Sequence, residues 1–175
     1  LTESVSHDAE IVIKEKHAEI NNGSIRAIIT TAGKITFFNQ RGKILLEERL
    51  RNRDNILEPY CSALNIKARE FKQKSGRLPE LSVRFEGHDE KIYGMGIFQE
   101  PLLDLKGSDL ELAPRNSQVS IPYYISSRGY GFLWNNPAIG RVTFSSNVTT
   151  WYAAATDKMD YWITAAETPM RRVEA

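Results

Sequence analysis

The fold is decided by residues 24–47, which read Ser24-Ile-Arg-Ala-Ile-Ile-Thr-Thr-Ala-Gly-Lys-Ile-Thr-Phe-Phe-Asn-Gln-Arg-Gly-Lys-Ile-Leu-Leu-Glu47. Short runs rich in β-branched and aromatic residues are separated here by Ala32-Gly33 and Arg41-Gly42. Such runs are typical of strands, and glycine-containing pairs between them are typical of tight turns. The stretch therefore predicts a meander of strands joined by hairpins.

The same pattern continues along most of the chain. It predicts further strands at residues 11–13, 63–68, 81–85, 123–126, 130–134, 141–144, 149–152 and 161–164. About ten strands at this spacing indicate a sandwich or a barrel. No segment before Thr168 has helical periodicity, so we expect an all-β fold, an antiparallel β-sandwich. Residues 101–122, bracketed by prolines, are expected to form a long excursion.

Composition excludes several classes of protein. The 175 residues are 41% hydrophobic and 26% charged, and 23 Lys and Arg against 22 Asp and Glu give a net charge of +1. Scattered, balanced charge argues against a partner that is a nucleic acid or an anionic membrane. No apolar run approaches the roughly 18 residues of a membrane span, so a soluble protein is expected. The single Cys61 excludes an internal disulfide and is interpreted as a small core residue.

The two ends of the chain suggest how it is organised. Residues 1–8 are polar and are expected to form a flexible lead-in, followed by one β-sandwich domain at residues 9–167. Thr168-Pro169 combines an N-cap residue with a proline suited to the first helical position. Residues 168–175 are therefore expected to begin a helix that is cut short and connects to a further domain.

Few residues offer catalytic chemistry. The acidic candidates are Asp104, Asp109 and Glu111, and we interpret the last two as the solvated edge of a strand. The three histidines are not at metal-ligand spacing, so no metal site is expected. Gly94-Met95-Gly96 lacks the third glycine of a dinucleotide fingerprint, so no cofactor is expected. We expect these glycines to let the backbone turn or pass close to another segment.

Aromatic residues gather in the last third of the chain. They are Tyr123, Tyr124, Tyr130, Phe132, Trp134, Trp151, Tyr152, Tyr161 and Trp162. Aromatic residues at alternating positions of a sandwich usually form its core. The alternative is a free-standing carbohydrate-binding module whose aromatic faces stack on sugar rings, and a buried Trp134 would count against it.

Several motifs in one order are similar to the N-terminal domain of glycoside hydrolase family 31. The motifs are Ile92-Tyr-Gly-Met-Gly-Ile-Phe-Gln99, Leu103-Asp-Leu-Lys-Gly107, Glu111-Leu-Ala-Pro-Arg-Asn116 and Ile121-Pro-Tyr-Tyr-Ile-Ser-Ser-Arg-Gly-Tyr-Gly-Phe-Leu-Trp-Asn-Asn-Pro137. The resemblance covers residues 9–175 and implies a galactose-mutarotase-like β-sandwich followed by a catalytic (β/α)8 barrel. It also implies a retaining α-glucosidase or α-xylosidase that works by double displacement.

The resemblance places the catalytic carboxylates elsewhere. The family's nucleophile lies in a Trp-x-Asp-Met-Asn-type motif, which this chain lacks. We therefore expect this chain to contain no catalytic residue and to be inactive alone. The barrel of the same enzyme and an oligosaccharide are the expected partners, with homo-oligomerisation through an exposed apolar patch as a further expectation. The expected location is cytoplasmic, with periplasmic or secreted as the alternative.

A loop of this domain is implied to reach the rim of the substrate site. By motif position we expect Asn116 to contact sugar hydroxyls and Arg115 to orient Asn116 or the loop, the alternative being a loop-stabilising hydrogen bond. Phe98 and Gln99 follow the Tyr-Gly-x-Gly turn and are also candidate substrate contacts. Ile97-Phe98 departs from the family pattern, so an apolar seal against the barrel is an equal alternative.

A third hypothesis also follows from the fold that the resemblance implies. A sugar epimerase of the mutarotase kind needs a histidine and a carboxylate in one cleft. His17 and His88 are the candidates, and the hypothesis fails if both are remote from any acidic cleft.

Overall fold

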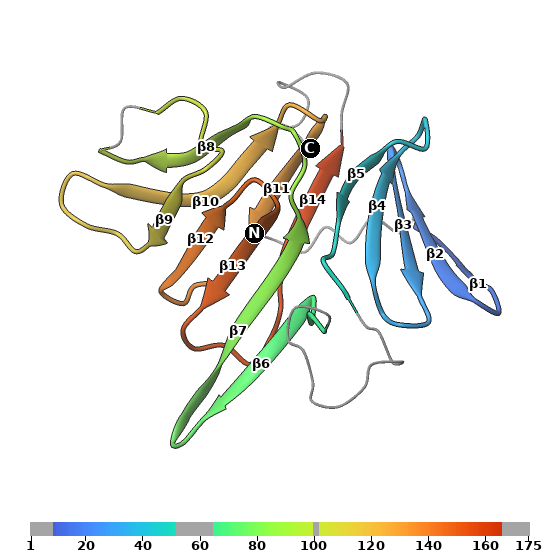
Figure 1. Ribbon diagram of the computed structural model, residues 1–175, viewed down its shortest axis with the longest axis horizontal. Coiled ribbons are helices and arrows are strands. Elements are labelled where there is room, and N and C mark those ends of the chain that lie inside the picture. Colours follow the sequence, from blue (N-terminus) through green and yellow to red (C-terminus); the bar gives the residue numbers. More distant parts are fainter. Residues whose placement is uncertain (1–8, 52–64, 100–101, 166–175) are drawn as a thin grey trace. The chain divides into compact units, whose positions relative to one another are not determined.

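The computed structural model describes residues 9–51, 65–99 and 102–165, and all regular structure in these ranges is β-strand (Figure 1). Every pairing between neighbouring strands is antiparallel. The predicted all-β fold is therefore confirmed. Within the described ranges there is no helix of the length and apolarity needed to cross a membrane. The chain divides after Glu47 into two compact units, each described by itself below.

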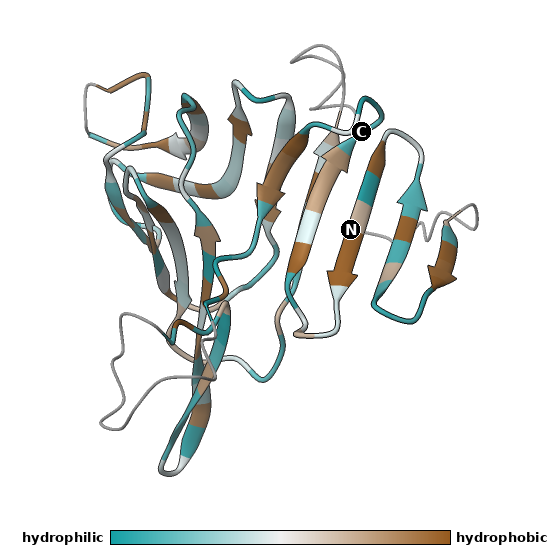
Figure 2. Cartoon of the chain, turned by 45° about the vertical axis from the view of Figure 1, so that its right-hand side comes forward, coloured by the Kyte–Doolittle hydropathy of each residue, from teal (hydrophilic) through white to brown (hydrophobic). Residues whose placement is uncertain are grey.

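The first unit is a single five-stranded sheet in which each strand pairs with the next along the chain. Its strands are β1 (Glu10–Ile13), β2 (His17–Asn22), β3 (Ile25–Thr30), β4 (Ile35–Asn39) and β5 (Ile44–Glu47). Gly33 and Gly42 have φ values of 79° and 74°, the left-handed conformation that the two hairpin turns require. Hydrophobic and hydrophilic bands alternate along these strands (Figure 2). The predicted meander is confirmed.

The second unit contains two sheets. The first has the order β14-β11-β10-β8 and the second the order β6-β7-β13-β12-β9. Their strands are β6 (Arg69–Lys74), β7 (Arg77–Glu86), β8 (Ile92–Ile97), β9 (Asp109–Leu112), β10 (Val119–Ser126), β11 (Tyr130–Trp134), β12 (Gly140–Phe144), β13 (Val148–Ala153) and β14 (Tyr161–Ala165). Aromatic side chains join the two sheets, so the unit is a β-sandwich.

The core of the sandwich is a cluster of stacked aromatic rings. Phe132 on β11 lies 5.1 Å from Trp151 on β13, and Trp134 lies 5.4 Å from the same indole, all between ring centroids. Tyr124 on β10 meets Phe144 on β12 edge to face at 5.4 Å. All five side chains are at most 1% exposed. The interpretation that the aromatic residues of the last third form the core is therefore confirmed for these five, whereas Trp162 is 45% exposed and is not part of the core.

The Gly94-Met95-Gly96 segment bends β8 against β10. All three residues have positive φ values of 120°, 68° and 97°, although Met95 is not a glycine and its side chain is fully buried. The register with β10 shifts here, so that three residues of β10 lie opposite Met95 alone. A Cβ on Gly96 would lie 2.0 Å from the backbone oxygen of Val119. The predicted close approach of two backbones is confirmed.

Some expectations about single segments were wrong. Residues 65–68 form no strand, because Ile66 makes only an isolated bridge with Arg51. The 101–122 excursion contains a regular strand, β9, which pairs with β12. The described residues also include β2, β6 and β8, which the strand pattern did not predict.

Other expectations concern parts of the chain that the structure leaves undescribed. The lead-in at residues 1–8, the start of a helix at 168–175 and Cys61 lie outside the described residues. A single domain over residues 9–167 stays a prediction.

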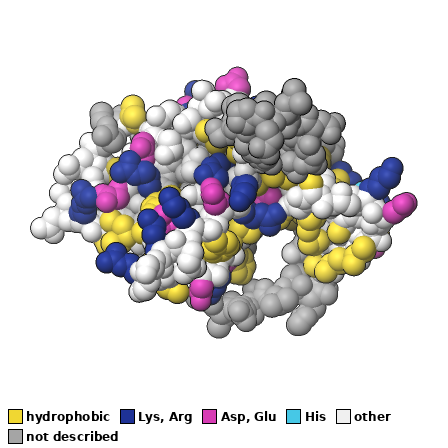
Figure 3. All heavy atoms as spheres, turned by 60° about the horizontal axis from the view of Figure 1, so that its bottom comes forward, with side chains coloured by type: hydrophobic (Ala, Val, Ile, Leu, Met, Phe, Trp, Pro, Cys, Tyr) yellow, Lys and Arg dark blue, Asp and Glu magenta, His cyan; other side chains and the backbone are white. Residues whose placement is uncertain are grey.

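The charges of the described residues are mixed in sign. Lys and Arg side chains lie among Asp and Glu side chains on the face that Figure 3 turns to the viewer. Many of them form ion pairs, such as Lys74 with Glu80 and Arg84 with Glu70. A surface of this kind carries no extended field of one sign.

Candidate functional site

A two-residue turn presents Asn116 and Ser117 between β9 and β10. The backbone N–H of Gln118 donates to the oxygen of Arg115 at 3.1 Å, which closes the turn. Ser117 has a φ of 67°, a left-handed conformation that such a turn requires of one central residue. Its hydroxyl donates to the backbone oxygen of Asn116 at 2.6 Å. The tip of the turn is thereby fixed locally.

The pairing of β8 with β10 brings the predicted residue Gln99 to this turn. Ile97 and Val119 are register partners, so the end of β8 lies beside the residues that follow the turn. The side-chain amide of Gln99 donates to the Ser117 hydroxyl at 3.1 Å. Gln99 and Asn116 are both exposed, and Phe98 is half-buried. The structure thus places Phe98 and Gln99 next to the Asn116 turn.

Arg115 contacts the strand before the turn. Its guanidinium forms an ion pair with the carboxylate of Glu111 on β9. This contact braces the turn against β9, which agrees with a role in orienting the loop. No described residue hydrogen-bonds the side-chain amide of Asn116. Toward the described residues, the amide of Asn116 is therefore able both to donate and to accept, and the choice between a sugar contact and a loop-stabilising hydrogen bond stays a prediction.

The three acidic candidates are engaged in structural contacts. Asp109 on the exposed edge strand β9 pairs with Arg141 of β12 at 2.8 Å, and Glu111 pairs with Arg115. Partial burial alone would raise the pKa of Asp104. The backbone N–H groups of Ile92 and Lys106 donate to this carboxylate and hold its pKa below the usual value. The interpretation of Asp109 and Glu111 as a strand edge agrees with these contacts.

A buried polar cluster around Glu90 was not identified from the sequence. The Glu90 carboxylate accepts hydrogen bonds from the hydroxyls of Ser126 and, at 3.0 Å, Tyr130. The hydroxyls of Tyr124 and Tyr130 are 3.1 Å apart, and the Lys106 ammonium lies 3.9 Å from Glu90. Burial, followed by the charge of Glu90, raises the pKa of Tyr124. The one signal in the sequence is Ser126, a polar residue at an inward position of β10.

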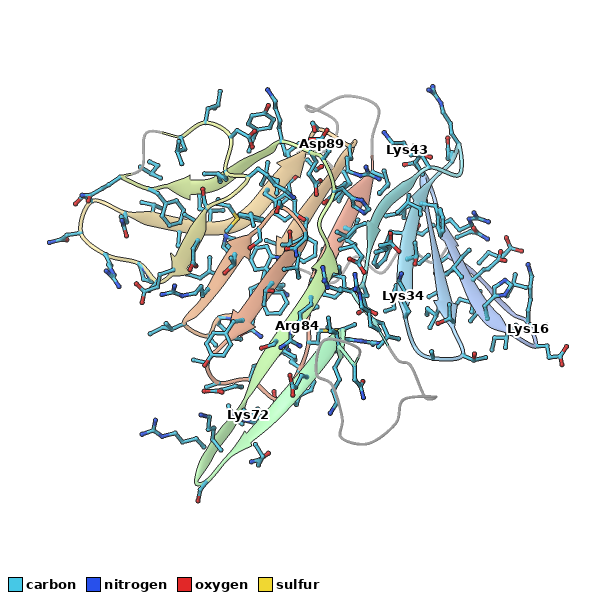
Figure 4. All side chains as sticks on the ribbon, in the orientation of Figure 1. Lys16, Lys34, Lys43, Lys72, Arg84 and Asp89 are labelled. Carbon is cyan, nitrogen blue, oxygen red and sulfur yellow. The ribbon has the colours of Figure 1, made fainter. Side chains whose placement is uncertain are left out.

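A hollow of about 570 Å³ lies beside β6 and β7, away from the predicted residues. Its lining includes Arg49, Lys67, Glu70 and Arg84, the last labelled in Figure 4. Arg84 donates to the backbone oxygen of Lys67 at 3.0 Å and pairs with Glu70 at 3.3 Å. Arg49 pairs with Glu86 at 3.4 Å. Arg49 and Arg84 thus serve ion pairs within the second unit, and none of the predicted residues lines the hollow.

The structure also bears on the two alternative functions. Trp134 is 1% exposed, which counts against a carbohydrate-binding module that uses it as a platform. His17 Nε2 lies 2.8 Å from a carboxylate oxygen of Glu19, which also accepts from Lys14 at 2.7 Å. Both residues lie on β2 of the first unit, so this group is a surface ion pair on one strand. It does not form the cleft that an epimerase requires.

Metal ligands are not gathered in the described part of the chain. Within residues 9–51, 65–99 and 102–165, no three His, Cys, Asp or Glu side chains lie where they could hold a metal ion.

The chain is similar in sequence to proteins of family 31. It is 47% identical over 174 residues to a family 31 glucosidase of Pseudescherichia vulneris, a match that covers 94% of this chain and 33% of that protein. It is 42% identical over 79 residues to alpha-xylosidase A of Aspergillus niger, covering 45% of this chain and 11% of that protein. No family model matches the chain. The chain spans about a third or less of the length of these relatives.

Solved structures of xylosidases are also similar to this chain. A GH31 alpha-xylosidase from a soil metagenome, complexed with xylose, superposes with a TM-score of 0.85 and is 48% identical, covering 94% of this chain and 25% of that one. A xylosidase from Aspergillus niger superposes with a TM-score of 0.71 and is 29% identical, covering 86% of this chain and 21% of that one. Both matches leave most of the relative beyond the region shared with this chain.

Proposed function

The chain belongs to glycoside hydrolase family 31, in which it corresponds to a non-catalytic N-terminal part of the enzyme, and from this premise we propose that the whole enzyme hydrolyses terminal α-linked xylosides. The observation that carries the proposal is 48% identity to a GH31 alpha-xylosidase over 94% of this chain. A glucosidase is also among the relatives, so α-glucosides are the second substrate class.

The proposed reaction is a double displacement at the anomeric carbon. One carboxylate attacks this carbon while a second protonates the leaving oxygen, and the two groups stand about 5 Å apart in retaining enzymes. Water then hydrolyses the glycosyl-enzyme intermediate. We assign both carboxylates to the barrel, because Asp104, Asp109 and Glu111 are each held by structural partners.

The proposed role of this domain is to supply part of the substrate rim. The exposed amide of Asn116 both donates and accepts hydrogen bonds, which suits sugar hydroxyls. Gln99 holds the turn through Ser117, and Arg115 braces it through Glu111. Gln99 and Arg115 therefore act as positioning residues for Asn116, and Phe98 borders the rim.

The substrate class is tested by steady-state kinetics on the full-length enzyme. We expect kcat/KM to be higher for p-nitrophenyl α-xyloside than for the α-glucoside, and we expect the 175-residue chain alone to hydrolyse neither. A higher value for the α-glucoside would reverse the substrate assignment. Turnover by the 175-residue chain would overturn the assignment of both carboxylates to the barrel.

The rim role is tested by replacing Asn116. A neutral hydrogen bond contributes about 1 kcal/mol, so Asn116→Ala should lower kcat/KM for an oligosaccharide about fivefold. Gln40→Ala is the matched control, an exposed amide in the turn between β4 and β5, and should leave kcat/KM unchanged. Equal kinetics for the two variants would show that Asn116 is only a turn residue.

A further inference from the structure

Two asparagines of the first unit lead into hairpin turns at the same end of its sheet. Asn22 ends β2 before the turn to β3, and Asn39 ends β4 before the turn to β5 (Figure 1). A hollow of about 470 Å³ is lined by Gly23 and Ser24 of one turn and by residues 39–42 of the other. Because both turns border the same hollow, a difference in their chemistry has to come from their own contacts.

The side chain of Asn39 is held by its own turn. Its Oδ1 accepts hydrogen bonds from the backbone N–H of Arg41 at 3.0 Å and from that of Lys43 at 2.9 Å. The backbone oxygen of Asn39 also accepts from the N–H of Gly42 at 3.0 Å. Asparagine side chains that bond the backbone in this way stabilise turns. This amide has to break two hydrogen bonds before it can rotate toward another group.

Asn22 and Gly23 lack such contacts. Both residues are exposed. Among the described residues, no group forms a hydrogen bond with the side-chain amide of Asn22 or with the backbone N–H of Gly23. A Cβ built on Gly23 would meet no atom within 4 Å, so nothing shields this nitrogen. The amide and the neighbouring nitrogen are therefore both available to react with each other.

An asparagine amide and the backbone nitrogen of the next residue react without any catalyst. The nitrogen loses its proton and attacks the side-chain carbonyl carbon, Cγ, and the new C–N bond closes a succinimide ring. The bond between Cγ and Nδ2 breaks, and Nδ2 takes up the proton and leaves as ammonia. Water then adds to either ring carbonyl and opens the ring to aspartate or isoaspartate. The only co-reactant is water, and no group is oxidised or reduced.

We propose that Asn22 is a site of spontaneous covalent modification, converted through a succinimide to isoaspartate and aspartate, whereas the turn of Asn39 protects its amide. The product carries a carboxylate in place of a neutral amide. Isoaspartate also routes the backbone through the former side chain, which adds a methylene where the turn sets the register of β2 and β3. The modification is independent of the proposed substrate, because Asn22 and the candidate site belong to different units.

Two other exposed asparagines lack the unshielded nitrogen. Asn147 precedes Val148, whose branched Cβ crowds the attacking atom. The amide of Asn116 is available toward the described residues, but Ser117 carries a side chain where Gly23 has none. We therefore expect the turn between β2 and β3 to react first.

The test is an ageing experiment on the full-length enzyme in mildly alkaline buffer, where the attacking nitrogen loses its proton more readily. Peptide mapping by mass spectrometry follows each asparagine, and an isoaspartyl methyltransferase distinguishes isoaspartate from aspartate. We expect the Asn22 peptide to convert at least about tenfold faster than the Asn39 peptide, because two hydrogen bonds restrain the Asn39 amide. Asn22→Gln keeps Gly23 and should remove the reaction, because the longer side chain closes a ring far more slowly.

Gln40→Gly separates the effect of the turn from that of the neighbouring residue. It gives Asn39 the same following residue as Asn22 and leaves the hydrogen bonds from Arg41 and Lys43 in place. In the folded variant we expect Asn39 to stay about tenfold slower than Asn22. In urea, where the turn is lost, we expect the two asparagines to react at similar rates.

Two results would overturn the proposal. If Asn22 of the folded wild type reacts no faster than Asn39, the availability of its amide and of the Gly23 nitrogen does not make it reactive. If Asn39 of folded Gln40→Gly reacts as fast as Asn22, the following residue alone decides and the turn gives no protection. Neither result depends on substrate turnover, so both are separate from the kinetics of Asn116→Ala.

Discussion

The aromatic core of the sandwich and the exposed apolar residues of β10 and the loop after β8 have similar chemistry and opposite surroundings. Trp151 is fully buried among four other rings, whereas Leu103 is 81% exposed. Strand β10 contributes to both regions: its Tyr124 points inward, whereas Val119, before the register shift, and Ile121, within it, are exposed. The comparison teaches that the position of an apolar residue along one strand decides whether it contributes to folding: Tyr124 does, and the exposed Val119 and Ile121 contribute little.

The largest loss of stability is expected for a substitution in the aromatic core. Trp151→Ala removes an indole that stacks on Phe132 and Trp134, and a large-to-small change of this kind should lower the free energy of unfolding by about 3–5 kcal/mol. Urea unfolding of the 175-residue chain measures it. Trp162→Ala is the control, because Trp162 is 45% exposed and should lose only about 1 kcal/mol. Equal losses would remove the distinction between core and surface.

The second-largest loss of stability is expected in the buried polar cluster around Glu90. Glu90→Ala leaves the hydroxyls of Ser126 and Tyr130 without their acceptor inside the sandwich, and we expect a loss of about 2–3 kcal/mol. Asp109→Ala breaks an exposed ion pair with Arg141 and should cost about 0–1 kcal/mol. Urea midpoints of the two variants give the comparison, and a Glu90→Ala protein as stable as wild type would disprove the structural role of the cluster.

The bend in β8 should have a slightly smaller effect. At Gly96 the backbone φ is 97°, and the Cβ that Gly96→Ala adds would lie only 2.0 Å from the Val119 oxygen. We therefore expect this variant to lose about 2 kcal/mol of its free energy of unfolding. Gly23→Ala has a φ of 54° and open space around its Cβ, so about 1 kcal/mol is expected. Thermal unfolding of both variants ranks them, and the reverse order would mean that the two backbones can separate without cost.

Substitution of the exposed Leu103 should have almost no effect on the stability of this chain. Because Leu103 is 81% exposed, Leu103→Glu should change the free energy of unfolding of the 175-residue chain by no more than about 0.5 kcal/mol. The same urea experiment measures it beside Trp151→Ala. A loss near that of the core variant would make Leu103 part of the folding core and would remove the contrast between the two regions.

The smallest effect concerns the surface of the first unit. The hydrogen bond from Lys14, and to a smaller extent that from His17, lowers the pKa of Glu19 from 4.5 to about 2. Because the pKa is lower in the folded state, the stabilisation is complete above pH 4.5 and is lost as pH falls toward 2. Glu19→Gln should therefore flatten the pH dependence of unfolding in this window. A carboxyl NMR titration of the wild type with a midpoint near 4.5 would contradict the prediction.

Much of the fold could be predicted from local pattern, and the failures have local causes. The hairpins of residues 24–47 follow from short β-branched runs and two glycines, and these need no distant contact. β6 was missed because Arg69–Lys74 is a mostly charged edge strand with no apolar alternation. β8 was missed because Gly94 and Gly96 interrupt its pattern, although pairing with β10 keeps the segment extended.

The candidate site could be predicted only in part. Motif order indicated Arg115 and Asn116, but the contact of Gln99 with Ser117 depends on the register of β8 and β10. The Glu90 cluster joins residues that are 36 and 40 positions apart, so no local spacing reveals it. Such clusters depend on which strands face each other in the sandwich, and a single sequence does not give that arrangement directly.

The stacked indoles also give the molecule its own optical probe. The chain has three tryptophans, of which Trp134 and Trp151 stack at 5.4 Å inside the sandwich and Trp162 is half exposed. The buried pair should emit at short wavelength and resist quenching by iodide, while Trp162 should be quenched. Intrinsic fluorescence can therefore follow the interior and the surface of one domain in the same cuvette, without any label.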